Sequence, residues 1–447
     1  MRRTSRSRPQ AVVISIDGTP YSLLRRMMAA GHMPHFSQLV REGDFRELYS
    51  VYPAISSVAW SSFMTGQNPA KHGIFGFVDR QPGTLKTFIT TARHMQSRTL
   101  WEVLSAAGNR VLVMNVPVTY PPRPVNGILV GDFLSPDLQK AAYPPGIAPE
   151  LERLGYVIDM DAWEGRQNKT KLLADVGNAL AARERALFHF MAQETWDYVH
   201  CHIMETDRLH HFLWEEMELG DERYAPGFFA FYQQVDAFLG RVRERLTPQT
   251  TLIVLSDHGF CRLQREFYVN TWLRQRGWLR FAKEQPKALE DMDPASMAYA
   301  LDPGRIYLNL RGRDPHGAVE PGAEYEQRRD EIIAAALALT DPDTGAPIVA
   351  RAMRREEVYH GPLLERAADI ILHPHNGYDL KGALYKETLT FKGTELVGMH
   401  TYEDALLYIR GHKITAERPW IADLMPTILR LLDVPLPPDL DGKPLVG

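Results

Sequence analysis

Short apolar runs alternate with longer amphipathic segments along most of the chain. The short runs are rich in Val, Ile and Leu and are bounded by polar residues, Gly or Pro. Strands of a covered parallel sheet have this composition, because helices pack on both faces and leave no solvent-facing side. We therefore predict buried strands at residues 11–16, 111–114, 128–130, 197–204 and 251–255.

The longer segments between these runs carry apolar residues at helical spacing. One of them, residues 98–107, opens with Thr99 and Glu102, which have the spacing of a capping box. Strands that alternate with helices indicate an α/β fold, in which a mostly parallel central sheet lies between two layers of helices. The other predicted helices are residues 21–43, broken near Pro34, residues 171–193 and residues 228–246.

The pattern becomes less regular after about residue 260. A strand at residues 306–310 and a helix at residues 323–339 are predicted there, among frequent Pro, Gly and charged residues. The α/β pattern then returns with strands at 369–372 and 405–409 and a helix at 421–432. We predict a basic flexible tail at residues 1–10, an α/β domain formed by residues 11–261 and 369–447, and an inserted cap subdomain at residues 262–368.

The composition is that of an ordinary globular protein and excludes several classes. The 447 residues carry a net charge of −4, so neither a nucleic-acid polymer nor an anionic membrane surface is indicated as a partner. Two cysteines are too few for a disulfide framework. No run approaches the roughly 18 apolar residues of a membrane span, and no signal-peptide pattern follows the basic start. We expect a cytoplasmic protein with no membrane partner, and the sequence leaves the oligomeric state open.

Three acidic residues follow predicted strands. Asp17 comes directly after the first strand, Asp207 shortly after the strand at 197–204, and Asp257 two residues after Leu255. Ligands of open parallel sheets gather outside the carboxyl ends of the strands. A single Asp after a strand more commonly caps a helix, so each acid alone is weak evidence for a site.

Histidines accompany these acids. His258 follows Asp257 at once, and His211 lies four residues after Asp207, on the same face of a helix, although His210 is an alternative partner. His400 precedes another predicted strand. Sixteen histidines will produce some chance pairs with acids, but three acids and three histidines near strand ends favour a metal site. Oxygen and nitrogen ligands without thiolates suit Zn²⁺ or Mn²⁺.

Four serines lie close together before and inside a predicted helix. A serine hydroxyl bound to a divalent metal loses its proton more readily near neutral pH, as metal-bound water does. The amino end of the following helix would also favour an anionic oxygen. Ser56 is the candidate nucleophile, whereas Ser57, Ser61 and Ser62 are expected to cap or pack the helix.

The alkaline phosphatase superfamily carries these residue types in the same order, and the chain resembles it from about residue 11 to the C-terminus. Within the superfamily, the chain is similar to the type I phosphodiesterase/nucleotide pyrophosphatase family. The resemblance rests on Asp17, the segment from Ser56 to Thr65-Gly66, the pair Asp207 and His211, Asp257-His258-Gly259 and Gly398-Met399-His400.

The resemblance implies a metal-dependent phosphoric ester hydrolase with an alkaline phosphatase-like fold, most of all a phosphodiesterase that acts on a small-molecule phosphate ester. The α/β domain would be the catalytic domain. Ser56 would attack phosphorus in line and form a covalent phospho-enzyme, with two divalent ions, Zn²⁺ or else Mn²⁺, at the site. The resemblance assigns one ion to Asp207, His211 and His400, and the other to Asp17, Ser56, Asp257 and His258.

The chain departs from the family at one position that concerns the substrate. Phe77 stands where the nucleotide-cleaving members carry an Asn that holds a phosphate oxygen, which argues against nucleotide pyrophosphatase activity. Phe75 and Phe77 could instead form an apolar wall for a leaving group, or simply pack in a core. Val58 and Trp60 stand where sulfatases carry Pro and Arg, which argues against a sulfatase.

Two alternatives stay open. The same two-metal site could serve a phosphomonoesterase or a phosphonate hydrolase, for which a lysine such as Lys381 or Lys386 could bind the additional charge. A non-catalytic binding protein with this fold is the alternative of another class, although all seven candidate ligand positions carry metal-competent side chains. His200 and His202 could support the metal ligands or be satisfied core histidines.

Overall fold

The computed structural model describes residues 10–447. These residues form two compact units. Unit 1 consists of the chain up to Asn68, Thr91–Phe260 and Glu395–Gly447, and unit 2 consists of Pro69–Thr90 and Cys261–Thr394. The basic tail predicted at residues 1–10 lies outside the described residues, apart from Gln10. The division into a catalytic domain and a cap subdomain stays a prediction about function.

Unit 1 is built on an eight-stranded sheet in the order β2-β19-β9-β1-β8-β5-β6-β7. Five neighbouring strands, β9, β1, β8, β5 and β6, run parallel, whereas β19 and β7 are antiparallel to their neighbours. The mostly parallel central sheet predicted from the sequence is therefore confirmed. The strands are β1 (Ala11–Ile16), β2 (Gly43–Leu48), β5 (Val111–Met114), β6 (Gly127–Val130), β7 (Ala142–Tyr143), β8 (Tyr198–Ile203), β9 (Thr251–Leu255) and β19 (Ala405–Arg410).

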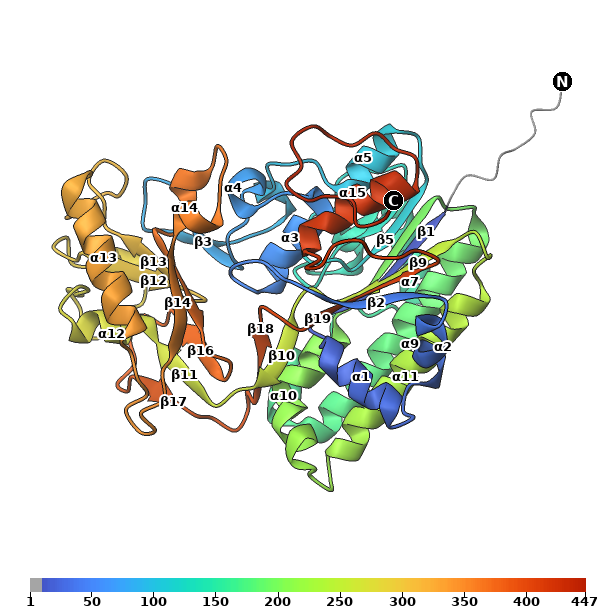
Figure 1. Cartoon of the computed structure of the whole chain (residues 1–447), viewed down its shortest axis with the longest axis horizontal. Coiled ribbons are helices and arrows are strands. Elements are labelled where there is room, and N and C mark those ends of the chain that lie inside the picture. Colours follow the sequence, from blue (N-terminus) through green and yellow to red (C-terminus); the bar gives the residue numbers. More distant parts are fainter. Residues whose placement is uncertain (1–9) are drawn as a thin grey trace. The chain divides into compact units, whose positions relative to one another are not determined.

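Helices cover both faces of this sheet (Figure 1). α9, α10 and α11 pack together on one face, and α3, α5 and α15 pack together on the other. The helices of unit 1 are α1 (Tyr21–Ala29), α2 (Pro34–Val40), α3 (Ser56–Thr65), α5 (Leu100–Ala106), α6 (Leu138–Ala141), α7 (Ala148–Arg153), α8 (Ala162–Gln167), α9 (Lys169–Gln193), α10 (Glu205–Leu219), α11 (Ala225–Glu244) and α15 (Leu424–Leu431).

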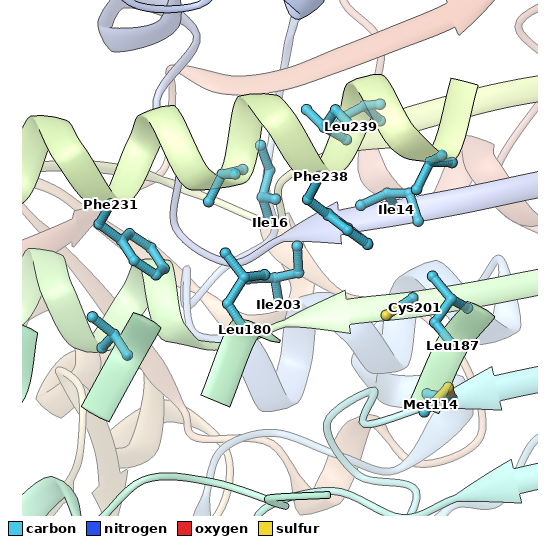
Figure 2. Close-up of a cluster of buried hydrophobic side chains, with 14 of the residues drawn as sticks. Ile14, Ile16, Met114, Leu180, Leu187, Cys201, Ile203, Phe231, Phe238 and Leu239 are labelled. Atoms are coloured by element: carbon cyan, nitrogen blue, oxygen red, sulfur yellow. The ribbon is translucent and has the colours of Figure 1, made fainter. Parts of the chain in front are cut away.

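The main hydrophobic core lies between the sheet and the helices α9 and α11. Successive side chains of a strand point to opposite faces, so Ile14 and Ile16 of β1 share one face. Figure 2 shows these two side chains with Leu180 of α9 and Phe238 of α11, and all four are buried in one hydrophobic cluster. The opposite face of β1 therefore belongs to Ser15 and, just beyond the strand, Asp17.

Local signals in the sequence predicted several element ends correctly. The strands at 11–16, 111–114 and 251–255 have the predicted bounds. The predicted helix at 21–43 is two helices, because Pro34 opens α2 at a position where Pro is favoured. The capping box is confirmed, since Thr99 N–H donates to Glu102 Oε2 over 2.8 Å at the start of α5.

Unit 2 has an antiparallel four-stranded sheet in the order β12-β13-β15-β14, with α13 packed beside β14. The strand predicted at 369–372 is present as β15, but it pairs with β13 and β14 and not with the central sheet. A short apolar run predicts a strand but not its partner. The elements are α4 (Pro69–His72), β3 (Val78–Arg80), β4 (Thr87–Ile89), β11 (Arg265–Tyr268), α12 (Val269–Gln275), β12 (Ala298–Leu301), β13 (Arg305–Leu308), α13 (Ala323–Leu337), β14 (Val349–Arg354), α14 (Arg355–Val358), β15 (Ile370–Pro374), β16 (Tyr378–Lys381) and β17 (Thr390–Phe391).

A separate two-stranded sheet is formed by β10 (Gly259–Arg262) and β18 (Gly398–Thr401). Within residues 10–447, no helix has the length and apolar character needed to cross a bilayer.

Candidate active site

The carboxyl ends of three neighbouring strands bring the predicted acids together. β1 lies between β8 and β9 and is parallel to both, so the residues after these strands share one edge of the sheet. Asp17 follows β1, Asp257 follows β9, and Asp207 lies in the first turn of α10, directly after β8. His400 precedes β19, and because β19 is antiparallel to β9, its first residues lie at the same edge.

One candidate metal group consists of Asp17, Asp257 and His258. One potential ligand atom from each of the three lies within 4.8 Å of the others. His258 Nε2 lies 3.3 Å from Asp257 Oδ2 and 3.5 Å from Asp17 Oδ1. All three residues are fully buried.

The other candidate metal group consists of Asp207, His211 and His400. His400 Nε2 lies 3.1 Å from Asp207 Oδ1, and His211 Nε2 lies 3.4 Å from the same oxygen. The side chains of His211 and His400 are 20% and 16% exposed. This group is therefore the one that faces solvent.

Ser56 is the first residue of α3, and its hydroxyl reaches the buried group. Ser56 Oγ donates to Asp17 Oδ1 over 3.2 Å and lies 3.3 Å from His258 Nε2. The hydroxyl of Ser61, by contrast, donates to the carbonyl oxygen of Ser57 inside the helix. The Ser56 hydroxyl thus contacts two of the predicted ligands.

Gly18 shapes the turn between Asp17 and the rest of the site. Its backbone has φ +61°, a left-handed conformation that favours Gly. A Cβ atom here would lie 3.0 Å from His258 Cε1. The Gly18 N–H also donates to Asp257 Oδ1 over 3.1 Å, so this turn orients the Asp257 carboxylate.

The tautomers of the three predicted histidine ligands follow from their backbone contacts. His258 Nδ1 lies 3.0 Å from the Gly259 carbonyl oxygen, His211 Nδ1 lies 3.0 Å from that of Gly398, and His400 Nδ1 lies 3.1 Å from that of Ala54. A carbonyl oxygen can only accept, so each Nδ1 carries hydrogen and each Nε2 of a neutral ring carries a lone pair.

Burial favours the neutral form of two of these histidines. It lowers the pKa of His258 to about 3 and that of His211 to about 4. Burial also raises the pKa of Asp257, and the charge of Asp17 adds to this effect.

The residues present fit divalent cations. The Nε2 lone pairs of His211 and His400 face each other at 3.0 Å beside a carboxylate oxygen, an arrangement that a cation would stabilise. Asp257 Oδ2 is buried without a hydrogen-bond partner. Each group offers three oxygen or nitrogen ligands and no thiolate, which is the donor chemistry of Zn²⁺ and Mn²⁺ sites.

His210 does not join either candidate group. Its Nδ1 lies 3.0 Å from the Gly18 carbonyl oxygen and its Nε2 lies 2.7 Å from the Tyr232 hydroxyl. Both ring nitrogens are therefore used in the core, and His211 is the histidine that meets Asp207.

Sequence reasoning missed two side chains at the site. Trp60 Nε1 donates to Asp17 Oδ2 over 2.9 Å, and Arg208 Nη1 lies 3.5 Å from Asp207 Oδ2. Trp60 is four residues after Ser56, on the same face of α3, and that spacing could have revealed it. Arg208 Nη2 also donates to Asp159 Oδ2 over 2.7 Å, which fixes the guanidinium beside Asp207.

The predicted substrate contacts and lysines belong to unit 2. Phe75 is buried, with its ring centroid 5.8 Å from that of Tyr359, and Phe77 is partly exposed. Lys381 Nζ lies 2.5 Å from Asp379 Oδ2, and Lys386 Nζ lies over the Tyr268 ring. A role for any of them in binding substrate stays a prediction.

Comparisons with known proteins identify the family and the fold of the chain. Residues 11–403 match the family described as type I phosphodiesterase / nucleotide pyrophosphatase. The structure is similar to phosphonoacetate hydrolase from Sinorhizobium meliloti 1021, with a TM-score of 0.67, 20% identity and 96% of each chain covered. It is also similar to murine ectonucleotide pyrophosphatase/phosphodiesterase 5, with a TM-score of 0.56, 16% identity and 96% of each chain covered. At these identities the likeness concerns the fold. None of the curated proteins matches the sequence.

Proposed function

Because the chain belongs to the type I phosphodiesterase/nucleotide pyrophosphatase family, a family of phosphoric ester hydrolases, we propose that it cleaves a small-molecule phosphodiester with Ser56 as the nucleophile. One observation carries the proposal. The Ser56 hydroxyl lies within 3.3 Å of both Asp17 and His258, and the other acid and histidine ligands of the family pattern lie at the same sheet edge.

Two divalent ions belong to this proposal. Asp17, Ser56, Asp257 and His258 would hold one, and Asp207, His211 and His400 would hold the other. When bound, such ions supply positive charge that lowers the pKa of a coordinated hydroxyl and stabilises charge on a phosphoryl group. Zn²⁺ is the first candidate and Mn²⁺ the second, because the ligands are imidazole nitrogens and carboxylate oxygens.

The chain's own residues prepare Ser56 for attack. Asp17 Oδ1 accepts the hydrogen bond from Ser56 and so fixes the direction of the hydroxyl. His258 is neutral and adds no proton that would compete at this oxygen. The amino end of α3 favours an anionic oxygen at Ser56 and a phosphate beside it, since the first N–H groups of a helix point outward.

The reaction would take two steps. In the first, Ser56 Oγ forms a bond to phosphorus, the P–O bond to one ester group breaks, and that group leaves as an alcohol with the Ser56 proton. In the second, water attacks phosphorus, the bond to Ser56 Oγ breaks, Ser56 Oγ takes back a proton from the water, and a phosphate monoester is released. Solved relatives bind phosphonoformate or AMP, which supports a small anionic substrate. Phe77 in place of the family's Asn makes a nucleotide the less expected one.

A phosphomonoester or a phosphonate is the second candidate substrate, and Arg208 favours it. A monoester carries one more negative charge than a diester. Arg208 places a fixed guanidinium beside Asp207, where it could bind that charge. Arginine binds phosphate oxygens in a planar, two-pronged geometry.

Paired hydrolysis assays test the proposal. Protein loaded with Zn²⁺ or Mn²⁺ is given bis(p-nitrophenyl) phosphate and p-nitrophenyl phosphate, with chelated protein and Ser56→Ala as negative controls. Ser61→Ala is the matched control, because the Ser61 hydroxyl donates to the Ser57 carbonyl oxygen inside α3. Faster diester cleavage that disappears in both negative controls supports the proposal. Faster monoester cleavage supports the second candidate, and no cleavage of either ester contradicts both for these substrates.

A further inference from the structure

A line of buried polar side chains crosses the face of the central sheet that faces α3. Tyr198, His200 and His202 occupy alternate positions of β8, so they share one face, and Ser15 of β1 lies among them. All four are 0% exposed. Central strands of a parallel sheet are ordinarily apolar on both faces, so this polar line needs a physical reason.

The register of β1 and β8 makes the line continuous. Ser15 pairs with His202 in the parallel ladder, so its hydroxyl lies between two histidines. Ser15 Oγ is 2.8 Å from His202 Nδ1 and 2.8 Å from His200 Nε2. The Tyr198 hydroxyl is 3.1 Å from His200 Nδ1, at the far end of the line.

The near end of the line is Asp17. His202 Nε2 lies 3.1 Å from Asp17 Oδ2, and this ring nitrogen makes no well-aligned hydrogen bond to any described atom, Asp17 included. Trp60 Nε1 donates to the same oxygen over 2.9 Å. The other oxygen, Oδ1, faces Ser56 Oγ at 3.2 Å and His258 Nε2 at 3.5 Å.

The two oxygens of Asp17 therefore have separate surroundings. Oδ2 faces the ring nitrogens of Trp60 and His202 in the core. Oδ1 faces the candidate nucleophile Ser56 and the predicted metal ligand His258. One set of hydrogen positions satisfies the whole line: Tyr198 O–H donates to His200 Nδ1, His200 Nε2–H to Ser15 Oγ, Ser15 O–H to His202 Nδ1, and His202 Nε2–H points to Asp17. A carboxylate can only accept, which fixes this direction.

We infer that His202, held by Ser15 and His200, is a positioning residue that keeps Asp17 Oδ1 directed at the cation next to Ser56. The inference rests on the proposed function and deepens it by assigning a support to one of the two candidate metal groups. Partners that hydrogen-bond to a metal ligand orient it, and their loss typically lowers metal affinity about 10- to 100-fold. The same loss should leave the group of Asp207, His211 and His400 unchanged.

Zinc titration of the full chain against a chromogenic chelator tests the inference without any assay of turnover. His202→Leu removes the N–H and should weaken one of two zinc sites by about 10- to 100-fold. His202→Gln loses the same ring packing against Trp60 but keeps an amide donor, so its affinity should lie between those of His202→Leu and the parent protein. Cys201→Ala is the matched control, because Cys201 is equally buried on β8 but points to the opposite face.

Three results would overturn the inference: two zinc sites of parental affinity in His202→Leu, equal losses in His202→Leu and His202→Gln, or an equal loss in Cys201→Ala. If circular dichroism shows that His202→Leu does not fold, Ser15→Ala is compared with Cys201→Ala. Weaker zinc binding at one site in Ser15→Ala alone supports the inference. Equal zinc affinities in the two variants overturn it. A parent protein that binds no zinc would contradict the proposed function itself, which keeps the two failures distinguishable.

Discussion

Ser56 and Asp17 are 39 residues apart in the chain, and their side chains meet because Ser56 Oγ donates to Asp17 Oδ1 over 3.2 Å. The contact joins the first residue of α3 to the residue that follows β1. Trp60, one turn further along α3, donates to the other oxygen of Asp17. One helix face thus holds both oxygens of one carboxylate, and the position of the candidate nucleophile depends on the packing of α3 against the sheet.

Removal of one ligand should remove one metal ion. We predict that the parent protein binds two zinc ions and that His400→Ala binds one, because the buried group of Asp17, Asp257 and His258 does not need His400 Nε2. Metal analysis after gel filtration in a fixed free zinc concentration measures this. His412→Ala is the control, since His412 lies by Thr251 at the amino end of β9. Loss of both ions, or of neither, in His400→Ala would refute the assignment of two separate groups.

Gly18→Ala should lower metal binding and activity, in addition to straining the backbone. The added Cβ would lie 3.0 Å from both His258 Cε1 and Phe260 Cδ2, so these side chains must shift. We expect loss of metal at the buried group and at least a tenfold lower kcat. Gly31→Ala is a matched control, because Gly31 also has positive φ but a Cβ there meets nothing within 4 Å. Each variant should lose about 1 kcal/mol of unfolding free energy from backbone strain alone. Equal activity in the two variants would show that the turn at Gly18 does not control His258.

Arg208→Gln should change substrate preference. If Arg208 binds the additional charge of a monoester, kcat/KM for p-nitrophenyl phosphate should fall about tenfold more than kcat/KM for the diester, which corresponds to about 1.4 kcal/mol. Arg241→Gln is the control, since Arg241 of α11 forms an ion pair with Glu184 of α9. Equal losses for the two substrates would mean that Arg208 acts through Asp207 or the fold and not through substrate charge.

Asp132 should make the stability of the protein depend on pH. Burial raises the pKa of Asp132 to about 7, although its carboxylate accepts N–H groups of Leu134 and Thr119. A carboxyl whose folded pKa is raised binds more protons in the folded state, so its contribution is fully present below the ordinary pKa of 3.8 and is lost as pH rises through about 7. One such proton contributes a slope of at most about 1.4 kcal/mol per pH unit.

Urea unfolding at pH 5 and pH 8 measures this effect in the parent protein and in Asp132→Asn. The parent should lose more stability between the two pH values than Asp132→Asn, whatever the absolute stability of the variant. Identical losses in the two proteins would show that Asp132 is not the group responsible.

The sequence predicted the acids of the site because each follows an apolar run that is a strand of the sheet. The spacing placed His400 near a strand end, but its assignment to the same ion as Asp207 and His211 came from the family resemblance, since the contact depends on the antiparallel direction of β19. The contact of Trp60 with Asp17 could have been inferred from its spacing to Ser56. The contact of Arg208 with Asp207 could not, because it depends on the direction of the Arg208 side chain in the folded protein. The strand at 369–372 was found, but its partners β13 and β14 were not, because strand pairing depends on distant residues. The catalytic roles of the site residues stay predictions.

The central claim is that Ser56 carries the phosphoryl group during turnover. Acid quenching of the zinc-loaded protein during hydrolysis of bis(p-nitrophenyl) phosphate, followed by mass spectrometry of the peptides, tests it most directly. We predict a phosphoryl adduct on Ser56 that is retained in Ser61→Ala, together with loss of turnover by about three orders of magnitude in Ser56→Ala. An adduct on another residue, or parental turnover by Ser56→Ala, would contradict it.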